Sequence, residues 1–192
     1  AILADLEVGH SSLMALYRVL VGLATLELGR YKEAKTYLQT GLNLAREIGY
    51  QRPMALGLSA LGQVLLAEEE YAEAQQRLQA GAAIYRAIGQ RLELTRAVSN
   101  LSLAACGLGN IAEAEQYAYE GLQIAAEFQI ATPWCVLVQA AMALLLANQG
   151  KKEQAVELYA LLSCYPYVAN SPWFEDVVGR HIATVAATLP PE

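Results

Sequence analysis

The chain has 192 residues, of which 55% are hydrophobic and 17% are charged, and its formal net charge is −6. This length fits one domain that buries a substantial core. Because the Lys and Arg residues are scattered singly, the chain lacks the basic stripe that nucleic-acid phosphates require, and we expect no nucleic-acid partner.

Apolar residues recur at i, i+3, i+4 and i+7 spacing, which predicts helices throughout, and no alternation typical of strands is found. In chain order, the expected helices cover residues 11–28, 31–48, 51–68, 71–88, 91–108, 111–128, 133–148 and 151–164, followed by a last helix over 172–189. Glycines at 29, 109 and 150 are placed to end helices. Thr132 and Ser171 each precede a proline and are predicted helix caps.

A four-residue phrase returns along the chain at a spacing of 40 residues, and its last copy comes one residue late. The copies are Tyr31-Lys32-Glu33-Ala34, Tyr71-Ala72-Glu73-Ala74, Ile111-Ala112-Glu113-Ala114 and the degraded Lys152-Glu153-Gln154-Ala155. Such a period predicts stacked helical hairpins, since one hairpin cannot bury its apolar face alone. We expect a single domain over 1–192, cut from a longer protein, with repeats over about 11–50, 51–90, 91–130 and 131–165 and a capping helix over 171–189.

Small residues recur in register and predict where two backbones approach closely. The first helices share Gly22, Gly62, Ser102 and Ala143, and the second helices share Ala34, Ala74, Ala114 and Ala155. A third series, Gly41, Gly81 and Gly121, lies inside second helices, where each glycine costs roughly 0.5–1 kcal/mol relative to alanine. We expect each of these glycines to contact the first helix of the next unit.

These residues together resemble the tetratricopeptide repeat. The shared features are a small residue in the first helix, a Gly before the turn, an aromatic residue opening the second helix, and small residues 3 and 10 positions later. The resemblance covers about residues 12–165, although Glu69 stands for the turn Gly, and Ile111 and Lys152 stand for the aromatic. It implies an all-α, right-handed solenoid of about four helical hairpins plus a C-terminal capping helix.

Units of this length, followed by a break at Pro166 and a final helix, are also similar to a bacterial setting. They resemble the C-terminal repeat arrays of signal-transduction ATPases with numerous domains and of related transcriptional regulators. That resemblance implies a sensor module, in which binding of a ligand or partner releases a nucleotide-binding core encoded outside this chain.

The tetratricopeptide family binds its partners on the concave inner face, which the first helices form. Placing this sequence on that pattern predicts a partner-binding face made of Leu56, Ser59, Gln63, Arg96, Ser99, Asn100, Leu103 and Leu137, continued in the first unit by Leu16, Val19 and Leu23. The resemblance implies a protein, peptide or apolar small-molecule ligand, with Arg96 and Asn100 fixing its orientation. The alternative is that curvature of the array buries these leucines.

The titratable residues form no catalytic or metal-binding pattern. His10 and His181 are not spaced with cysteines or acids for a metal site or a triad, so we expect no enzyme activity, metal or cofactor. Cys106, Cys135 and Cys164 are odd in number and predict free thiols in the cytoplasm.

Two further segments of the sequence allow more than one interpretation. The uncharged stretch 128–150 contains Pro, Thr, Gln and Asn, and we interpret it as a buried helix, with no membrane contact expected. The aromatic residues of the C-terminal part are interpreted as the packed joint of the capping helix or, alternatively, as a docking surface; they are Tyr165, Tyr167, Trp173 and Phe174.

The second functional hypothesis is self-association into a homo-oligomer, through apolar surface on the first unit or the last helix.

Overall fold

The computed structural model describes residues 2–128 and 133–190, with side chains described over 11–128 and 136–190. Within these ranges the chain forms helices and no β-strand. The helices pair as α1 (Ile2–Glu27) with α2 (Tyr31–Glu47), α3 (Gln51–Ala67) with α4 (Tyr71–Ala87), α5 (Arg91–Gly107) with α6 (Ile111–Phe128), and α7 (Pro133–Asn148) with α8 (Lys152–Leu162). The predicted all-α array of hairpins is confirmed, and the predicted cap Thr132 lies outside the described residues.

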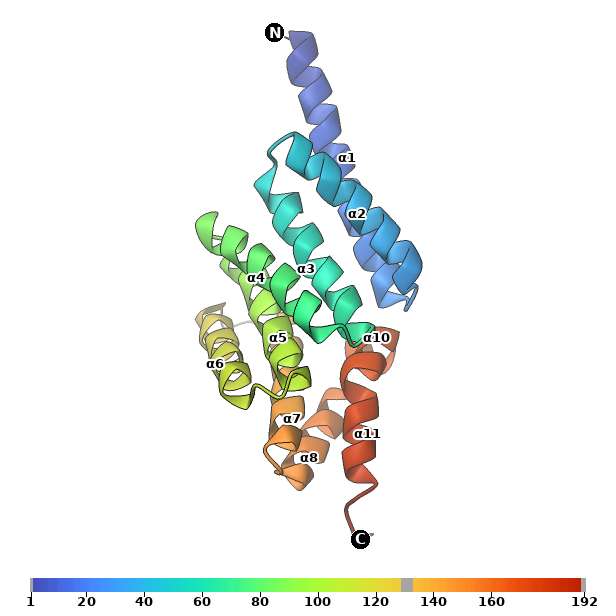
Figure 1. The fold of residues 1–192 in the computed structure, drawn as a ribbon, viewed down its shortest axis with the longest axis vertical. Helices are drawn as coiled ribbons and strands as arrows, with labels where there is room; N and C mark the ends of the chain where they lie inside the picture. Colours follow the sequence, from blue (N-terminus) through green and yellow to red (C-terminus); the bar gives the residue numbers. More distant parts are fainter. Residues whose placement is uncertain (1, 129–132, 191–192) are drawn as a thin grey trace.

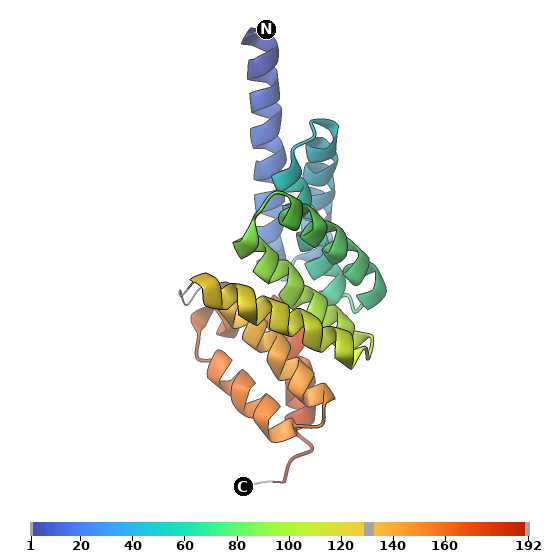
Figure 2. The same cartoon turned by 90° about the vertical axis from the view of Figure 1, so that its left-hand side faces the viewer.

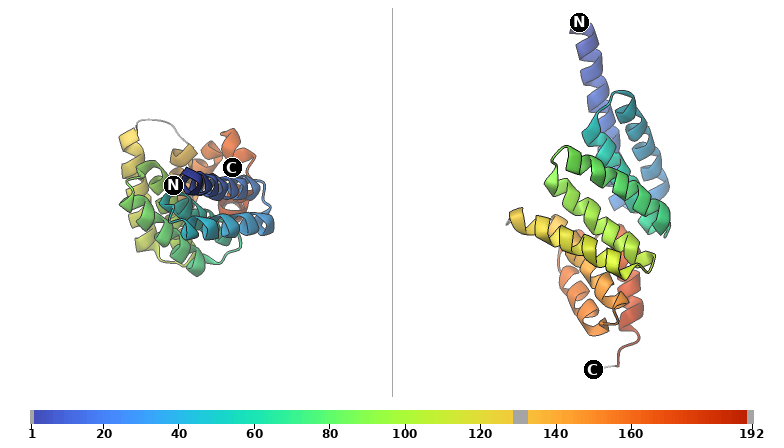
Figure 3. Two further views of the ribbon diagram at one scale, coloured as in Figure 1. Left: turned by 90° about the horizontal axis from the view of Figure 1, so that it is seen from above. Right: turned by 60° about the vertical axis from the view of Figure 1, so that its left-hand side comes forward.

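The hairpins stack along the long axis of the molecule, one after another (Figures 1 and 3). Each of α3, α5 and α7 packs against the second helix of the preceding unit as well as against its own partner. The first helices also contact one another in sequence, α1 with α3, α3 with α5 and α5 with α7. They therefore form the inner layer of the array, as the repeat pattern predicts.

The helical turns confirm the predicted role of glycine at helix ends. Five glycines at the ends of helices adopt the left-handed conformation, with φ between 69° and 78°: Gly29, Gly49, Gly89, Gly109 and Gly150. Glu69 occupies the equivalent position of the second unit with φ 62°. The second unit therefore keeps the same turn geometry, but Glu69 adopts a left-handed backbone conformation that favours glycine.

The small residues of the first helices close each hairpin. A Cβ added to Gly22 would lie 2.6 Å from Leu38 Cγ, and one added to Gly62 would lie 2.5 Å from Leu78 Cγ. In the third unit the Ser102 hydroxyl donates a hydrogen bond of 2.9 Å to the Ala114 carbonyl oxygen. The predicted close approach within each hairpin is confirmed for these three units.

The expected role of the third glycine series is wrong for its first two members. A Cβ added to Gly41 would lie 2.8 Å from Val19 Cγ2 and 3.1 Å from the Ala15 carbonyl oxygen, both in the same hairpin. Gly81 likewise faces α3, its own partner helix. Gly121 alone of the three approaches the next unit, where its added Cβ would lie 3.3 Å from Val138 Cγ2. The period identifies which residues share a face of a helix, but it does not identify the helix that covers that face.

The first helix begins earlier than the periodicity predicted. The expected range was 11–28, whereas α1 begins at Ile2, and its N-terminal half extends beyond the other helices (Figure 2). No proline interrupts residues 2–27, and the segment is rich in Leu, which favours helix. The helix therefore continues past the length of its partner α2.

The C-terminal part is more broken than the single helix predicted over 172–189. It comprises α9 (Pro166–Ala169), α10 (Pro172–Phe174), the π-helical turn η1 (Glu175–Gly179) and α11 (Arg180–Ala186). The predicted cap at Ser171 is confirmed, because its hydroxyl accepts a hydrogen bond of 3.4 Å from the Phe174 N–H. This segment returns to the array, where α10 contacts α1 and η1 contacts both α3 and α7.

Candidate functional site

A pocket of about 350 Å3 opens on the inner layer of the array, at the end formed by the first unit. Residues of α1, α3 and α5 surround it, together with one residue near the end of α4. The lining residues are Leu16, Leu20, Leu23, Arg52, Leu56, Tyr85, Glu93 and Arg96.

One wall of the pocket is apolar and comes from α1. Leu16, Leu20 and Leu23 follow i, i+4 and i+7 spacing, so a single face of the helix carries all three. None of the three is fully buried, and Leu20 is exposed. Leu56 of α3 adds a buried side chain. The chain therefore leaves a row of leucines only partly covered on this wall.

The polar part of the lining comes from α3 and α5. Arg52 and Glu93 form a salt bridge of 3.4 Å between these two helices. Arg96 lies nearly one turn after Glu93, and it is buried although it carries a charge. Two guanidinium groups and one carboxylate therefore line the pocket.

Arg96 also influences the ionisation of its neighbours. Burial raises the pKa of the Tyr85 hydroxyl, while the Arg96 guanidinium and the Ser59 hydroxyl beside it act in the opposite direction. At the end of α1, burial raises the pKa of Glu27, and hydrogen bonds from Ser171 and Tyr167 and the charge of Arg96 partly oppose that rise. Arg96 thus supplies positive potential to the floor of the pocket.

The structure buries all eight residues of the predicted binding face. Leu56 and Arg96 meet in the pocket. Ser59 and Ser99 instead face the second helices of their hairpins, since Ser59 Oγ would lie 2.5 Å from a Cβ added to Gly81, and Ser99 Oγ would lie 3.4 Å from one added to Gly121. The binding role of these residues stays a prediction.

The remaining four predicted residues lie farther along the array. The backbone carbonyl of Gln63 is covered by the C-terminal segment, and the buried Asn100 amide has no hydrogen-bond partner among the described residues. Leu103 lines a second hollow of about 220 Å3 together with Tyr71, Cys106, Leu144 and His181. Leu137 is buried in the core.

The periodicity missed part of the pocket wall. Leu16 and Leu23 were placed on the inner face because they share register with Leu56 and Gln63, but Leu20 was not. Arg52, Tyr85 and Glu93 lie at the ends of their helices, where helical register says least about which side chains meet. The sequence offered one signal for this part of the pocket: Arg52 and Glu93 carry opposite charges on successive units.

The C-terminal segment covers the middle of the inner layer. The Trp173 indole N–H donates a hydrogen bond of 2.9 Å to the Gln63 carbonyl oxygen, and Trp173 and Phe174 are both buried. Ser171 donates a hydrogen bond of 3.1 Å to Glu27, and Tyr31 donates to Asp176. Of the predicted aromatic joint, Trp173 and Phe174 are buried, and the partly exposed Tyr167 packs edge-on against Phe174 with ring centroids 5.5 Å apart. Tyr165 is exposed.

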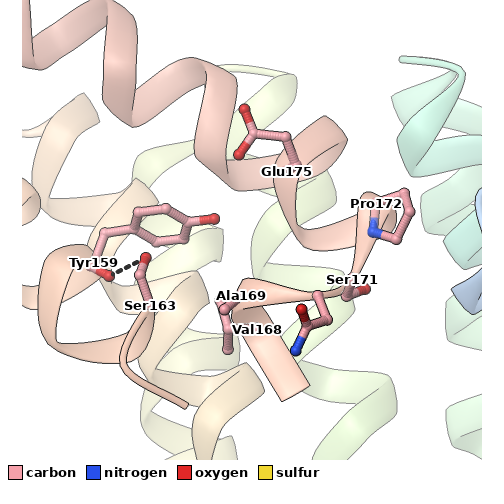
Figure 4. Close-up of a pocket in the computed structure, with 8 residues that line it drawn as sticks. Tyr159, Ser163, Val168, Ala169, Ser171, Pro172 and Glu175 are labelled. Carbon is pink, nitrogen blue, oxygen red and sulfur yellow. Dashed lines mark hydrogen bonds between the residues drawn. The ribbon is translucent and has the colours of Figure 1, made fainter. Parts of the chain in front are cut away.

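A larger hollow of about 460 Å3 lies where the cap joins the last hairpin, and Figure 4 shows its lining side chains. Its walls come from α8, α9 and η1, and they include Tyr159, Val168 and Glu175. Burial and the nearby Glu175 carboxylate raise the pKa of Tyr159 to about 12. None of the eight predicted binding residues lines this hollow.

The described residues contain no group of three or more His, Cys, Asp or Glu side chains that could hold a metal ion. Among the helices of the described residues, none combines the length and apolar character that crossing a membrane requires. Cys106 and Cys164 carry free thiols, the first buried and the second exposed, and the Cys135 side chain lies outside the described set.

No family model and no curated protein matches the sequence. Among solved structures, the chain is similar to the crystal structure of the nearly identical TPR-like repeats of a putative kinesin light chain from Podosopora anserina. The TM-score is 0.62, and the two chains share 16% identity over 93% of this chain and 95% of that one. The chain has a tetratricopeptide-like repeat fold.

Proposed function

We propose that this chain is a protein-interaction module that binds an apolar segment of a protein partner in the pocket between α1, α3 and α5. The observation that supports the proposal is the partly uncovered row of Leu16, Leu20 and Leu23, beside the part of the inner layer that Trp173 closes. Apolar side chains left uncovered in a concave surface mark a recognition site.

The partner segment is an amphipathic helix with leucine-like anchors. Leucines at i, i+4 and i+7 on α1 form a row that matches the apolar face of such a helix, and burial of that face contributes about 25 cal/mol per Å2. The positively charged guanidinium groups of Arg52 and Arg96 in the lining favour an acidic residue beside the anchors. This local charge is opposite in sign to the net charge of the chain, which is −6.

The biological setting is part of the same proposal. We place the array in the sensor region of a cytoplasmic bacterial signalling protein, where partner binding controls an effector that lies outside this chain. The support is the similarity of the 40-residue units, the Pro166 break and the final helix to such arrays.

A peptide selection tests the proposal. A random peptide library displayed on phage would be selected on the 192-residue chain, and an enriched peptide would be titrated against single variants by fluorescence anisotropy. We expect enriched peptides to carry apolar residues at helical spacing with an acidic neighbour, and Leu20→Glu and Arg52→Glu to weaken binding about tenfold or more.

Leu161→Glu is the matched control, since Leu161 is also an exposed leucine but lies on α8, away from the pocket. It should leave the affinity unchanged. Equal affinity of the peptide for the wild type, Leu20→Glu and Arg52→Glu would remove the pocket as the binding site.

A further inference from the structure

The hollow between the last hairpin and the C-terminal segment contains a carboxylate without an ion-pair partner. Glu175 begins the π-helical turn η1, and it lines this hollow, whose volume is about 460 Å3. Within the described part of the chain no ion pair involves Glu175, whereas the next acid, Asp176, is paired with Arg180. The Glu175 charge is therefore open to a cation from outside the chain.

The glycine at position 179 brings a second oxygen atom beside this carboxylate. A Cβ added to Gly179 would overlap the Glu175 carboxylate and would lie 2.9 Å from the Tyr159 hydroxyl oxygen. Figure 4 shows the Glu175 and Tyr159 side chains directed toward one another. Any side chain at position 179 would displace the carboxylate, so the glycine preserves this pair of oxygens. Short π-helical turns within helices are frequent at functional sites.

The hydroxyl groups of the lining already donate their hydrogens to other groups of the protein. Tyr159 donates to the Phe174 carbonyl oxygen at 3.4 Å. Ser163 donates to the main chain of α8 at 2.9 Å, and Ser171 donates to Glu27 at 3.1 Å. A hydroxyl has one hydrogen and two lone pairs, so toward a ligand these three groups act as acceptors.

The amide of Asn170 adds a further acceptor. Its nitrogen donates to the Pro166 carbonyl oxygen at 2.9 Å, and its side-chain oxygen accepts no hydrogen bond from the described residues. Together with the Glu175 carboxylate, the lining therefore presents mainly acceptors and one negative charge. A group with several N–H donors and a positive charge matches this set, and ammonium and guanidinium groups have both properties.

We propose that this hollow binds an organic cation whose ammonium or guanidinium group donates to Glu175 and Tyr159. Val168, Ala169 and Pro172 supply apolar lining for a short alkyl stem. The volume lies in the range of about 300–1,000 Å3 that is typical of small-ligand sites. A free amine or guanidine and the Lys or Arg side chain of a second protein share the recognised group. None of the lining residues belongs to the first-unit pocket, so the two sites are separate.

Nuclear magnetic resonance of the isotope-labelled 192-residue chain, titrated with n-butylguanidinium chloride, tests the proposal. We expect amide shifts concentrated over residues 163–179 and a millimolar dissociation constant, since so small a ligand makes few contacts. Butyramide, which is neutral and similar in length, should cause no such shifts. Glu175→Gln should weaken binding about fivefold or more, because it removes a charge-assisted hydrogen bond. Glu175 is exposed, so this variant should keep the helical circular dichroism of the wild type.

Glu153→Gln is the matched control. It changes the net charge by the same amount, at an exposed position of α8 that does not line the hollow. It should bind n-butylguanidinium like the wild type. Equal affinity of Glu175→Gln and the wild type, equal weakening by Glu153→Gln, or equal shifts with butyramide would overturn the proposal.

A short peptide with a single central lysine identifies the source of the cation in the same titration. Shifts over the same residues would support the side chain of a partner protein as the natural occupant. No shifts with the peptide, beside a clear response to n-butylguanidinium, would support a free small molecule.

Discussion

The Trp173 indole N–H donates a hydrogen bond of 2.9 Å to the Gln63 carbonyl oxygen, joining residues 110 positions apart in the sequence. Trp173 also packs edge-on against Phe174, with ring centroids 5.2 Å apart. The C-terminal segment thus closes the middle of the inner layer, and Trp173 is one buried anchor of that closure. The part of that layer beside Leu20 is left open.

Replacing this anchor should cost much of the stability of the array. Trp173→Ala removes one of the largest fully buried side chains, and we expect the free energy of unfolding to fall by about 3–5 kcal/mol. Tyr165→Ala, at an exposed aromatic position of the same segment, should change it by less than about 0.5 kcal/mol. Urea denaturation followed by circular dichroism measures both. Equal losses in the two variants would contradict the assigned role of Trp173.

Gly41 and Gly57 should respond in opposite ways to the same substitution. A Cβ at Gly41 would meet the backbone of α1, 3.0 Å from the Val19 nitrogen, so Gly41→Ala should destabilise the chain by about 1–3 kcal/mol. A Cβ at Gly57 meets neighbours at 3.4 Å or more, and Gly57→Ala should stabilise the helix by about 0.5–1 kcal/mol.

Thermal unfolding monitored at 222 nm would compare the two glycine variants with the wild type. A Gly41→Ala chain that melts as late as the Gly57→Ala chain would show that the first hairpin is not closed by backbone contact at Gly41.

The turn of the second unit should become more stable when its glycine is restored. Glu69 adopts φ 62°, so Glu69→Gly should raise the free energy of unfolding by about 0.5–1 kcal/mol, since it relieves a left-handed conformation. Glu70 has φ −82° and gains nothing from the same change, which makes Glu70→Gly the control. Denaturant titration distinguishes them. A gain from Glu70→Gly as large as that from Glu69→Gly would refute the explanation by backbone strain.

The carboxyl of Glu27 should make stability depend on pH. Burial raises the pKa of Glu27 in the folded chain, so folding favours the neutral carboxyl. The stability that the neutral carboxyl contributes is lost as the pH rises from the ordinary pKa of 4.5 through the folded pKa. Glu27→Gln removes that loss and keeps an acceptor for Ser171. We expect the stability of the variant relative to the wild type to increase between about pH 4 and pH 7.

Parallel urea titrations of the wild type and Glu27→Gln across that range provide the measurement. The difference in unfolding free energy should grow with pH. A difference that is constant, or that shrinks as the pH rises, would mean that the Glu27 pKa is not raised in the folded chain.

The sequence predicted the hairpins because their determinants are local and repeated. Gly22 with Leu38, Gly62 with Leu78 and Ser102 with Ala114 place small residues at one register, and the turn glycines limit each helix. These signals depend on neighbours within about half a repeat, so periodicity alone reveals them.

The closure of the inner layer could not be predicted in the same way. Arg96 and Leu56 were predicted to lie on the inner face, and both line the pocket, but whether that face is open depends on where Trp173 packs. A contact across 110 residues leaves no periodic mark in the sequence. The π-helical turn at Glu175–Gly179, which lies within the range predicted as one regular helix, was missed for a related reason, because packing against α3 and α7 shapes it.

We propose that the array binds its partner at the first-unit end while the C-terminal segment remains in place. Amide hydrogen exchange, measured by mass spectrometry with and without a peptide enriched in the phage selection, tests this most directly. We expect slower exchange in the segments of α1, α3 and α5 that carry Leu20, Arg52 and Arg96, and unchanged exchange over residues 172–186. Faster exchange over 172–186, or protection confined to α7 and α8, would contradict it.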